Sequence, residues 1–334
     1  MRINIAQDAL QDTDSWGDLD AIVRKIDHGW HYWEIDDPDA VDASGWLEKR
    51  KQVRESFEKA AVTDSYRPGA TDLSKRKLLV TFNAISDAPE KTDILEPLRA
   101  AKFAERPLCV LMENQFSDGL FLDTILEHLA PQWVIKIRNE APEAIWYDHA
   151  GGNGQLPELI RKRKSEVSSE CQSIPIRAVA FTDSDAKFPG DKSANAKRVE
   201  AACAAAGFAC HILRKRAIEN YIPDEILDAS IPHKPDYNLR QTLEAVKRLS
   251  SCQRDHYPMK TRDAKKLRDN PPEEVKSLYR NVNESDWPHL SRGFGKDVIE
   301  KLQDHKHAIT PDGLRRRDGQ EELDILVAKI AEQL

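Results

Sequence analysis

The central third of the chain alternates short apolar runs with longer stretches in which apolar residues recur every three or four positions. Uninterrupted apolar runs are typical of strands covered on both faces, and the wider spacing is typical of helices with one buried face. The pattern predicts strands at residues 108–112, 133–137, 176–181 and 208–213. It predicts helices at residues 118–129, 156–169 and 194–206.

Strands that alternate with helices at this spacing predict βαβ units and a parallel sheet. We therefore expect residues 106–230 to form an α/β domain with a Rossmann-like, mostly parallel sheet flanked by helices. The regions on either side, 1–105 and 231–334, are expected to be mainly helical, with one short strand at 77–82. Ligands of such sheets bind beyond the carboxyl ends of the strands, so we expect the functional residues at this edge.

The N-terminal region is rich in tryptophan. Two amphipathic segments contain four of the seven tryptophans, which are Trp16, Trp30, Trp33 and Trp46. Tryptophan is typical of a small helical core, but it is also frequent at binding hot spots. We favour the core, and docking of a partner on this region stays open as the alternative.

Composition narrows the class of protein. The chain has 334 residues, a net charge of −7 and 40% hydrophobic residues, so it can bury a sizeable core. Its five cysteines form no Cys-x-x-Cys pair, which favours a reducing, cytoplasmic compartment. No apolar run reaches the ~18 residues that a membrane span needs, and the first residues do not have the pattern of a signal peptide.

An acidic chain argues against non-specific coating of nucleic acid, but not against an enzyme that joins carboxylates and phosphates through a divalent metal. The basic residues are clustered in runs at 161–164, 214–216, 260–268 and 315–317. Each run by itself is more typical of a solvated helix face. The candidates for contact with nucleic acid are Arg161, Lys162, Arg163, Lys164, Arg214, Lys215 and Arg216.

Acidic residues stand at the ends of two predicted strands. Glu113 follows the first, and Asp183 and Asp185 follow the third. Residues i and i+2 of an extended segment share a face, so the two aspartates can approach one cation. Mg²⁺ prefers oxygen ligands and takes one or two carboxylates together with water and phosphate. The alternative is that these residues cap the following helices; with acids on two strands of one sheet we favour a metal site.

The order of these features resembles the TOPRIM pattern. That pattern comprises a glutamate after a first strand, a glycine-rich middle segment, here 151–154, and a strand that ends in Asp-x-Asp. Residues 216–222, Arg-Ala-Ile-Glu-Asn-Tyr-Ile, are similar to the R-E-I-E-N-Y-L segment of the overcoming-lysogenization-defect (OLD) nucleases and of their relatives in phage-defence systems. The resemblance covers residues 107 to 227, approximately, and it implies a TOPRIM-type sheet.

The resemblance also implies roles for individual residues. Glu113 would be a metal ligand or general acid/base, and Asp183 and Asp185 would be metal ligands. Asp118 would match a further acid of the family, Glu219 a second-metal ligand, and Lys296 the late lysine that faces the scissile phosphate. The chain departs from the pattern at three points, which are Asn114 in place of glycine, one extra residue before Asp118, and Ala217 in place of glutamate.

The activity implied by the resemblance is hydrolysis of phosphodiester bonds in DNA or RNA with one or two Mg²⁺ or Mn²⁺ ions. OLD proteins are normally fused to an ATPase, and no GxxxxGK[ST] loop is visible in this chain. We therefore expect an effector of antiviral defence that works with a separate ATPase or sensor protein. Two alternatives stay open. One is a degenerate TOPRIM module that binds a partner or nucleic acid without cutting, and the other is a nucleotidyl transferase or primase.

Overall fold

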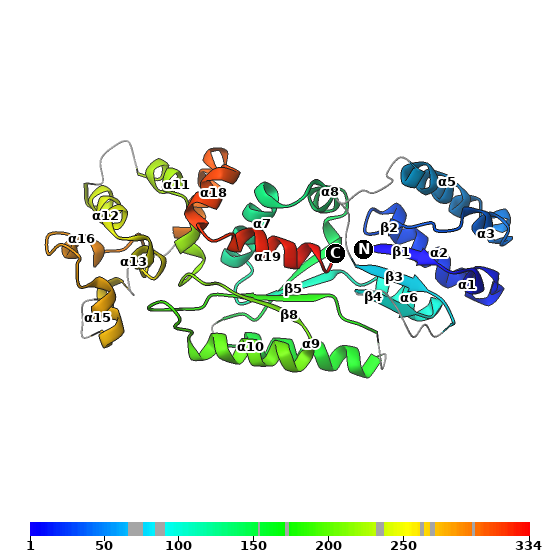
Figure 1. Cartoon of the computed structure of the whole chain (residues 1–334), viewed down its shortest axis with the longest axis horizontal. Coiled ribbons are helices and arrows are strands. Elements are labelled where there is room, and N and C mark those ends of the chain that lie inside the picture. Colours follow the sequence, from blue (N-terminus) through cyan, green and yellow to red (C-terminus); the bar gives the residue numbers. More distant parts are fainter. Residues whose placement is uncertain are drawn as a thin grey trace.

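A computed structural model shows an elongated α/β protein with two parallel sheets (Figure 1). The residues that the structure describes are 1–65, 76–83, 91–152, 154–170, 174–231, 237–260, 264–267, 271–295 and 298–334. The N-terminal sheet and the helices between residues 237 and 290 lie at opposite ends of the molecule, with the second sheet between them (Figure 1).

The N-terminal sheet has the strand order β2-β1-β3-β4, and all its neighbouring strands are parallel. Its strands are β1 (Arg2–Ile5), β2 (Tyr32–Trp33), β3 (Lys77–Val80) and β4 (Thr92–Leu95). Its helices are α1 (Gln7–Gln11), α2 (Trp16–Asp27), α3 (Pro38–Asp42), α4 (Trp46–Lys49), α5 (Lys51–Ser65) and α6 (Pro97–Ala104). The expectation of a mainly helical region was therefore incomplete. The strand predicted at 77–82 is present, and three further short strands complete a sheet.

The tryptophans of this region belong to its core. Trp16, Trp33 and Trp46 are buried in one hydrophobic cluster with β1 and β3, and the rings of Trp33 and Trp46 pack at a tilt of 52°. Trp30 is also buried, and it packs with the second sheet. Because these four side chains are covered, they are not available as docking anchors.

The second sheet has the order β6-β5-β7-β8 and is also entirely parallel. Its strands are β5 (Leu108–Met112), β6 (Ile145–His149), β7 (Ala178–Thr182) and β8 (Ala209–Ile212). Side chains from α7 (Ser117–Leu129) and α8 (Gln132–Glu140) pack on one face. Side chains from α9 (Leu156–Glu170) and α10 (Ala194–Ala206) pack on the other. Three of the four predicted strands and all three predicted helices of this domain are confirmed.

The strand predicted at 133–137 is wrong, because these residues lie in α8. Trp133, Val134 and Ile137 are buried on one side of that helix, which is the i, i+1, i+4 spacing of a helical face. A five-residue apolar run fits both a buried strand and a short helix. The missing strand is β6, where a half-buried pattern with an exposed Trp146 concealed it.

Beyond β8 the described chain is helical, as expected, and its elements are η3 (Ile218–Tyr221), α11 (Asp224–Ala229), α12 (Tyr237–Arg248), α13 (Ser251–Asp255), α15 (Glu273–Tyr279), α16 (Trp287–Leu290), α17 (Lys301–Asp304), α18 (Pro311–Asp318) and α19 (Glu322–Ala331). Helix α19 returns to the second sheet and packs on α7. It brings Leu334 beside Met1, whose amino group donates a hydrogen bond to the Leu334 carbonyl (Figure 1).

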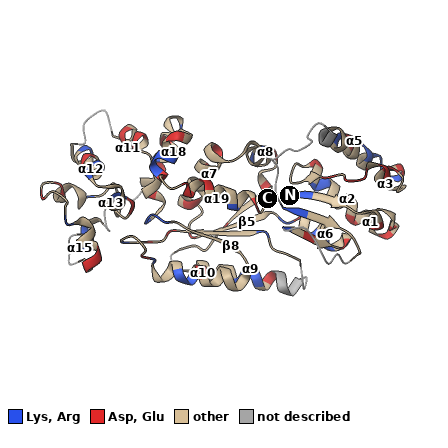
Figure 2. Ribbon diagram, viewed as in Figure 1, with Lys and Arg blue, Asp and Glu red and all other residues tan. Residues whose placement is uncertain are grey.

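Basic residues (blue) and acidic residues (red) are interspersed along the ribbon at both ends of the molecule (Figure 2). Among the described residues, no helix is long and apolar enough to cross a membrane.

Candidate functional site

The carboxyl ends of β5 and β7 carry the first acidic residues of the site. The two strands are adjacent and parallel, so Glu113 and Asp183 emerge at the same edge of the sheet. The carboxylate of Glu113 is held from two sides: its Oε1 accepts hydrogen bonds from Thr182 Oγ1 at 3.2 Å and from Asn195 Nδ2 at 2.6 Å. Asn195 lies in the first turn of α10, which Ser193 caps. The site is thus built jointly by β5, β7 and α10.

The Asp-x-Asp turn is fastened to the segment after β8. Ser184 is buried and donates a hydrogen bond from Oγ to the Lys215 carbonyl at 2.7 Å. Asp183 Oδ1 accepts a hydrogen bond from the Ile218 amide at 3.0 Å. Asp185 has a φ of +50°, a strained conformation for a residue other than glycine, and its amide bonds the Arg216 carbonyl at 2.9 Å. These bonds bring residues 183–185 against residues 215–219.

Glu219 is drawn into the site by this arrangement. It is only 3% exposed, and its Oε1 lies 2.9 Å from the ammonium of Lys260, which is 47% exposed. The capping of the 3₁₀ turn at Ile218–Tyr221 is done by Asn220, whose Oδ1 accepts from the Ala217 amide at 3.1 Å. Glu219 therefore has no capping role here. The neighbouring Tyr221 is fully buried, as expected for a core residue.

Asp118 turns back toward Glu113 in spite of the extra residue between them. Its Oδ2 accepts hydrogen bonds from the amides of Glu113 at 3.2 Å and Asn114 at 3.0 Å. The loop stays compact because Asn114 Oδ1 in turn accepts from the amides of Phe116 and Ser117. The insertion is thus absorbed by a side-chain-stabilised turn that projects Phe116 into solvent.

The acidic side chains influence one another electrostatically. Burial raises the pKa of Asp183 well above its usual value, and the negative charges of Glu219, Asp118 and Asp185 raise it further. Burial likewise raises the pKa of Asp118 and of Glu113, whose neighbours include other carboxylates of the cluster. These residues crowd negative charge into one place, which costs free energy until a cation or a proton compensates it.

Lys260 is the cation that the structure places in this cluster. Burial lowers its pKa, but the carboxylates of Glu219, Asp183 and Asp118 outweigh that effect and raise its pKa overall. Sequence analysis missed this residue, since Lys260 only opened a basic run interpreted as a solvated face. It missed Asn195 and Thr182 as well, which carried no local signal.

The donor set suits a hard divalent cation in its chemistry. Five carboxylates, those of Glu113, Asp118, Asp183, Asp185 and Glu219, influence one another through their charges. Three of them, those of Glu219, Asp183 and Asp118, also interact with the Lys260 ammonium. Asn195 Oδ1 is a buried oxygen with no hydrogen-bond partner within the described residues, beside the Glu113 carboxylate. In the side-chain positions shown, however, no three acidic, histidine or cysteine side chains of the described part of the chain are grouped as ligands of one ion.

The predicted nucleic-acid contacts divide into exposed and occupied side chains. Arg161, Lys162 and Lys164 lie exposed on α9, where Arg161 pairs with Glu158 at 3.1 Å and Lys162 with Glu166 at 3.7 Å. Arg163 is instead bound to Asp148 at 2.6 Å and to Glu166 at 2.7 Å. An arginine held in this way braces α9 against β6 and offers little to a phosphate.

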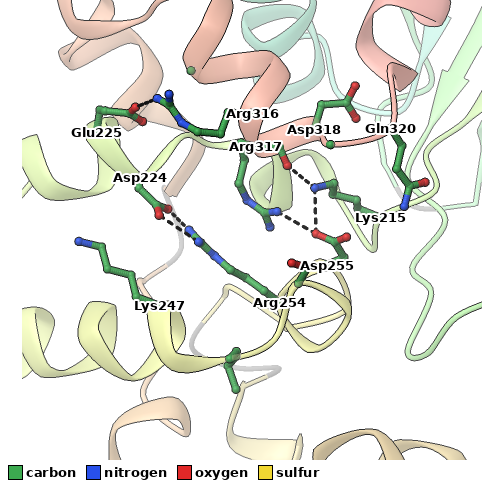
Figure 3. Close-up of a pocket in the computed structure, with 14 residues that line it drawn as sticks. Lys215, Asp224, Glu225, Lys247, Arg254, Asp255, Arg316, Arg317, Asp318 and Gln320 are labelled. Atoms are coloured by element: carbon green, nitrogen blue, oxygen red, sulfur yellow. Dashed lines mark hydrogen bonds and ion pairs between the residues drawn. The ribbon is translucent and has the colours of Figure 1, made fainter.

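In the second basic run Arg214 is exposed and Arg216 is half-buried, whereas Lys215 is only 4% exposed. Lys215 lies 2.8 Å from Asp255, which also binds Arg317 at 2.8 Å (Figure 3). Burial and the nearby Arg317 lower the pKa of Lys215 to about 8. These ion pairs line a cavity of about 410 Å³ and connect α13 and α18 to the segment that holds the Asp-x-Asp turn (Figure 3). Lys215 is therefore placed as a structural cation.

Two sequence predictions concern residues at the margins of the site. Lys296, predicted to face the scissile phosphate, lies outside the described residues. Of the glycine-rich loop, Gly151 and Gly152 have φ values of +77° and +148°, which glycine alone adopts readily. They line a second cavity, of about 710 Å³, together with Glu113.

Comparison with protein-family models finds no match to this chain. Comparisons with curated proteins and with solved structures also find none.

Proposed function

We propose that the chain is a Mg²⁺- or Mn²⁺-dependent nuclease of the TOPRIM type, similar to the OLD nucleases. The observation that carries the proposal is the convergence of five carboxylates at the carboxyl edge of a parallel sheet, where Glu113 and Asp183 end adjacent strands and residues 183–185 are bonded to residues 215–218. The negative charges of these carboxylates act on their neighbours in the cluster. The pKa values of Glu113, Asp118 and Asp183 are raised, and carboxylates crowded in this way are typical of functional sites.

The topology supports the same proposal. Glu113 and the Asp-x-Asp turn end the two central strands of a four-stranded parallel sheet, in the chain order that the resemblance implies. Helices cover both faces of that sheet, and the carboxylates are left at its edge. The further proposals of an antiviral role and of a separate ATPase or sensor partner depend on the resemblance alone.

In this proposal Asp183, Asp185 and Glu113 hold the first ion, and Asp118 and Glu219 contribute to a second. A bound divalent ion would lower the pKa of a water molecule and neutralise charge on the phosphate. Thr182 and Asn195 orient the Glu113 carboxylate. The ammonium of Lys260 is paired with Glu219 in this structure. In the reaction it would pair with a phosphate oxygen and stabilise the negative charge that develops there.

The test is to incubate the purified chain with plasmid, single-stranded DNA and total tRNA, in Mg²⁺, in Mn²⁺ and in EDTA. We expect cleavage of at least one substrate with either metal and none in EDTA. The control for substitutions of the clustered carboxylates is Glu140→Gln, which alters an exposed carboxylate on α8 and should cut at the parent rate. Cleavage that persists in EDTA, or the absence of cleavage under all conditions, would overturn the proposal.

One observation favours the second candidate, a TOPRIM module that binds without cutting. Lys260 already neutralises Glu219, and the described carboxylates are not grouped as ligands of one ion. If the module binds without cutting, nucleic acid should bind equally well in Mg²⁺ and in EDTA, and no cleavage products should form.

A further inference from the structure

A cavity of about 710 Å³ adjoins Glu113 on the side away from the Asp-x-Asp turn. It lies between the loop after β5, the first turns of α7 and the end of β6. Its volume is within the range of about 300–1,000 Å³ that small-ligand pockets occupy. Because Glu113 forms part of its wall, whatever occupies this cavity is held directly beside the candidate site.

The lining is aromatic and apolar, with neutral polar groups at intervals. Phe116, Tyr147, Leu120 and Gly119 supply the apolar surface, and a Cβ at position 119 would stand 3.4 Å from the Tyr147 ring. The side chains of Asn114, Gln115 and His149 supply further hydrogen-bonding groups. That distance is an ordinary van der Waals contact, so the first turns of α7 pass close to the tyrosine ring.

The charged side chains of the lining disfavour a phosphate as the occupant. No lysine or arginine lines this cavity in the described part of the chain, and its charged residues are Glu113 and Asp123. Asp123 is committed to other partners, since it accepts from Tyr147 Oη at 2.8 Å and lies 2.7 Å from Arg138. A flat, uncharged, hydrogen-bonding ring is the kind of ligand that this surface suits.

Phe116 gives the cavity an exposed aromatic face. It is 60% exposed, and it lies three residues after Glu113 on the turn that Asn114 stabilises. Exposing a phenylalanine to water is unfavourable unless the ring has a partner. Nucleobases stack on such rings with little dependence on sequence, because every base has a flat face.

We propose that this cavity receives one unstacked nucleobase of the substrate strand, so that the protein acts on single-stranded or locally unpaired nucleic acid. The proposal builds on the proposed nuclease function and names its substrate class. The base would lie against Phe116 while the adjoining phosphate reaches the carboxylates and Lys260.

The test measures binding of the full chain to a fluorescent single-stranded oligonucleotide, to the same strand in a duplex, and to an analogue in which the bases are replaced by abasic sites. Binding is measured in EDTA and again in Ca²⁺, and cleavage is measured separately in Mg²⁺. The variants are Phe116→Ala, Phe116→Trp and Leu98→Ala; the last removes a comparably exposed apolar side chain on α6, in the N-terminal region.

We expect the intact strand to bind better than the duplex, and Phe116→Ala to weaken that binding about 5- to 100-fold. Phe116→Trp should retain it, Leu98→Ala should leave it unchanged, and the abasic strand should be insensitive to Phe116→Ala. Equal losses on the intact and abasic strands, or no strand binding in either buffer, would overturn the proposal.

The two proposals fail in different ways. Metal-dependent cleavage that Phe116→Ala leaves unchanged, on single strands as on duplexes, removes the base pocket and keeps the nuclease. Phe116-dependent binding of single strands without cleavage in Mg²⁺ or Mn²⁺ supports the base pocket and removes the nuclease.

Discussion

At the scale of single residues, the candidate site is governed by the cost of crowding carboxylates. Asp183 is the most strongly affected, because burial and three neighbouring carboxylates all disfavour its charged form. The hydrogen bond that Asp183 accepts from the Ile218 amide can be accepted equally well by an amide oxygen. Charge and hydrogen bonding can therefore be separated by substitution at this position.

We expect Asp183→Asn to abolish cleavage and to raise the thermal midpoint of the metal-free protein. Asparagine keeps the bond to Ile218 and removes one of the repelling charges. Cleavage assays and thermal unfolding in EDTA and in Mg²⁺ check both parts. An Asp183→Asn protein that cuts at the parent rate would disprove the metal assignment.

Substitution of Glu219 distinguishes a role in metal binding from a role in stability. We expect Glu219→Gln to lower the cleavage rate at least 100-fold at limiting metal, because an amide does not hold a hard divalent ion as a carboxylate does. Its stability should change little, because the glutamine oxygen still accepts from Lys260, which is half-exposed to water.

The control is a substitution of the other partner in this ion pair, Lys260. Lys260→Met removes the cation and leaves Glu219 buried beside other acids, so it should destabilise the metal-free protein more than Glu219→Gln does. The measurements are thermal midpoints of both variants in EDTA and rates across a Mg²⁺ titration. A normal rate for Glu219→Gln at limiting metal would show that Glu219 has a structural role only.

At the scale of elements, the site depends on how the turn after β7 is tied to the segment after β8. Ser184 makes this connection from a buried position, since its hydroxyl donates to the Lys215 carbonyl and accepts from the Ala186 amide. On the far side of the segment, the Arg216 amide donates to the Asp255 carbonyl of α13 at 2.9 Å. The position of the two aspartates is therefore set by elements from three parts of the chain.

We expect Ser184→Ala to cost about 1–2 kcal/mol of stability, since a buried carbonyl loses its hydrogen bond. It should also lower cleavage about tenfold, with the loss partly restored at high Mg²⁺, because the aspartates keep their charge but lose their alignment. Urea unfolding and a metal titration of the rate test this. A loss of stability with an unchanged metal requirement would show that the connection does not position the aspartates.

At the scale of the whole molecule, the acidic cluster links stability to pH and to metal. The pKa values of Glu113, Asp118 and Asp183 are raised in the folded state, so the folded protein holds protons that the unfolded chain has already released. Their contribution to stability is fully present below the unfolded carboxyl pKa of about 4 and is lost as the pH rises through the raised values.

We therefore expect the thermal midpoint in EDTA to fall by a few degrees from pH 5 to pH 7.5, and Mg²⁺ to raise it more at the higher pH. Parallel measurements on Asp183→Asn isolate the cluster from other groups, including the buried His31, whose pKa is lowered mainly by burial. An identical pH dependence in parent and variant would contradict this origin.

The amino-acid sequence determined the local features of this protein. Uninterrupted apolar runs specified β5 and β7, because strands covered on both faces contain few polar positions. The strand β8, at the edge of the sheet and half-buried, was specified by the mostly apolar run at 208–213. Helical spacing specified α7, α9 and α10. The acids at the strand ends could be identified as a candidate site because parallel strands bring their carboxyl ends to one edge.

Only the tertiary structure decided the features that depend on distant parts of the chain. The N-terminal sheet consists of strands of two to four residues, which gain stability from neighbours far along the chain and leave little pattern of their own. The identity of α8 was decided by packing, since five apolar residues suit a strand equally well. Lys260 reaches Glu219 across 41 positions of the sequence, and Asp255 reaches Lys215 across 40. An ion pair of this kind is selected by where the backbone places two charges, and no local sequence pattern records it.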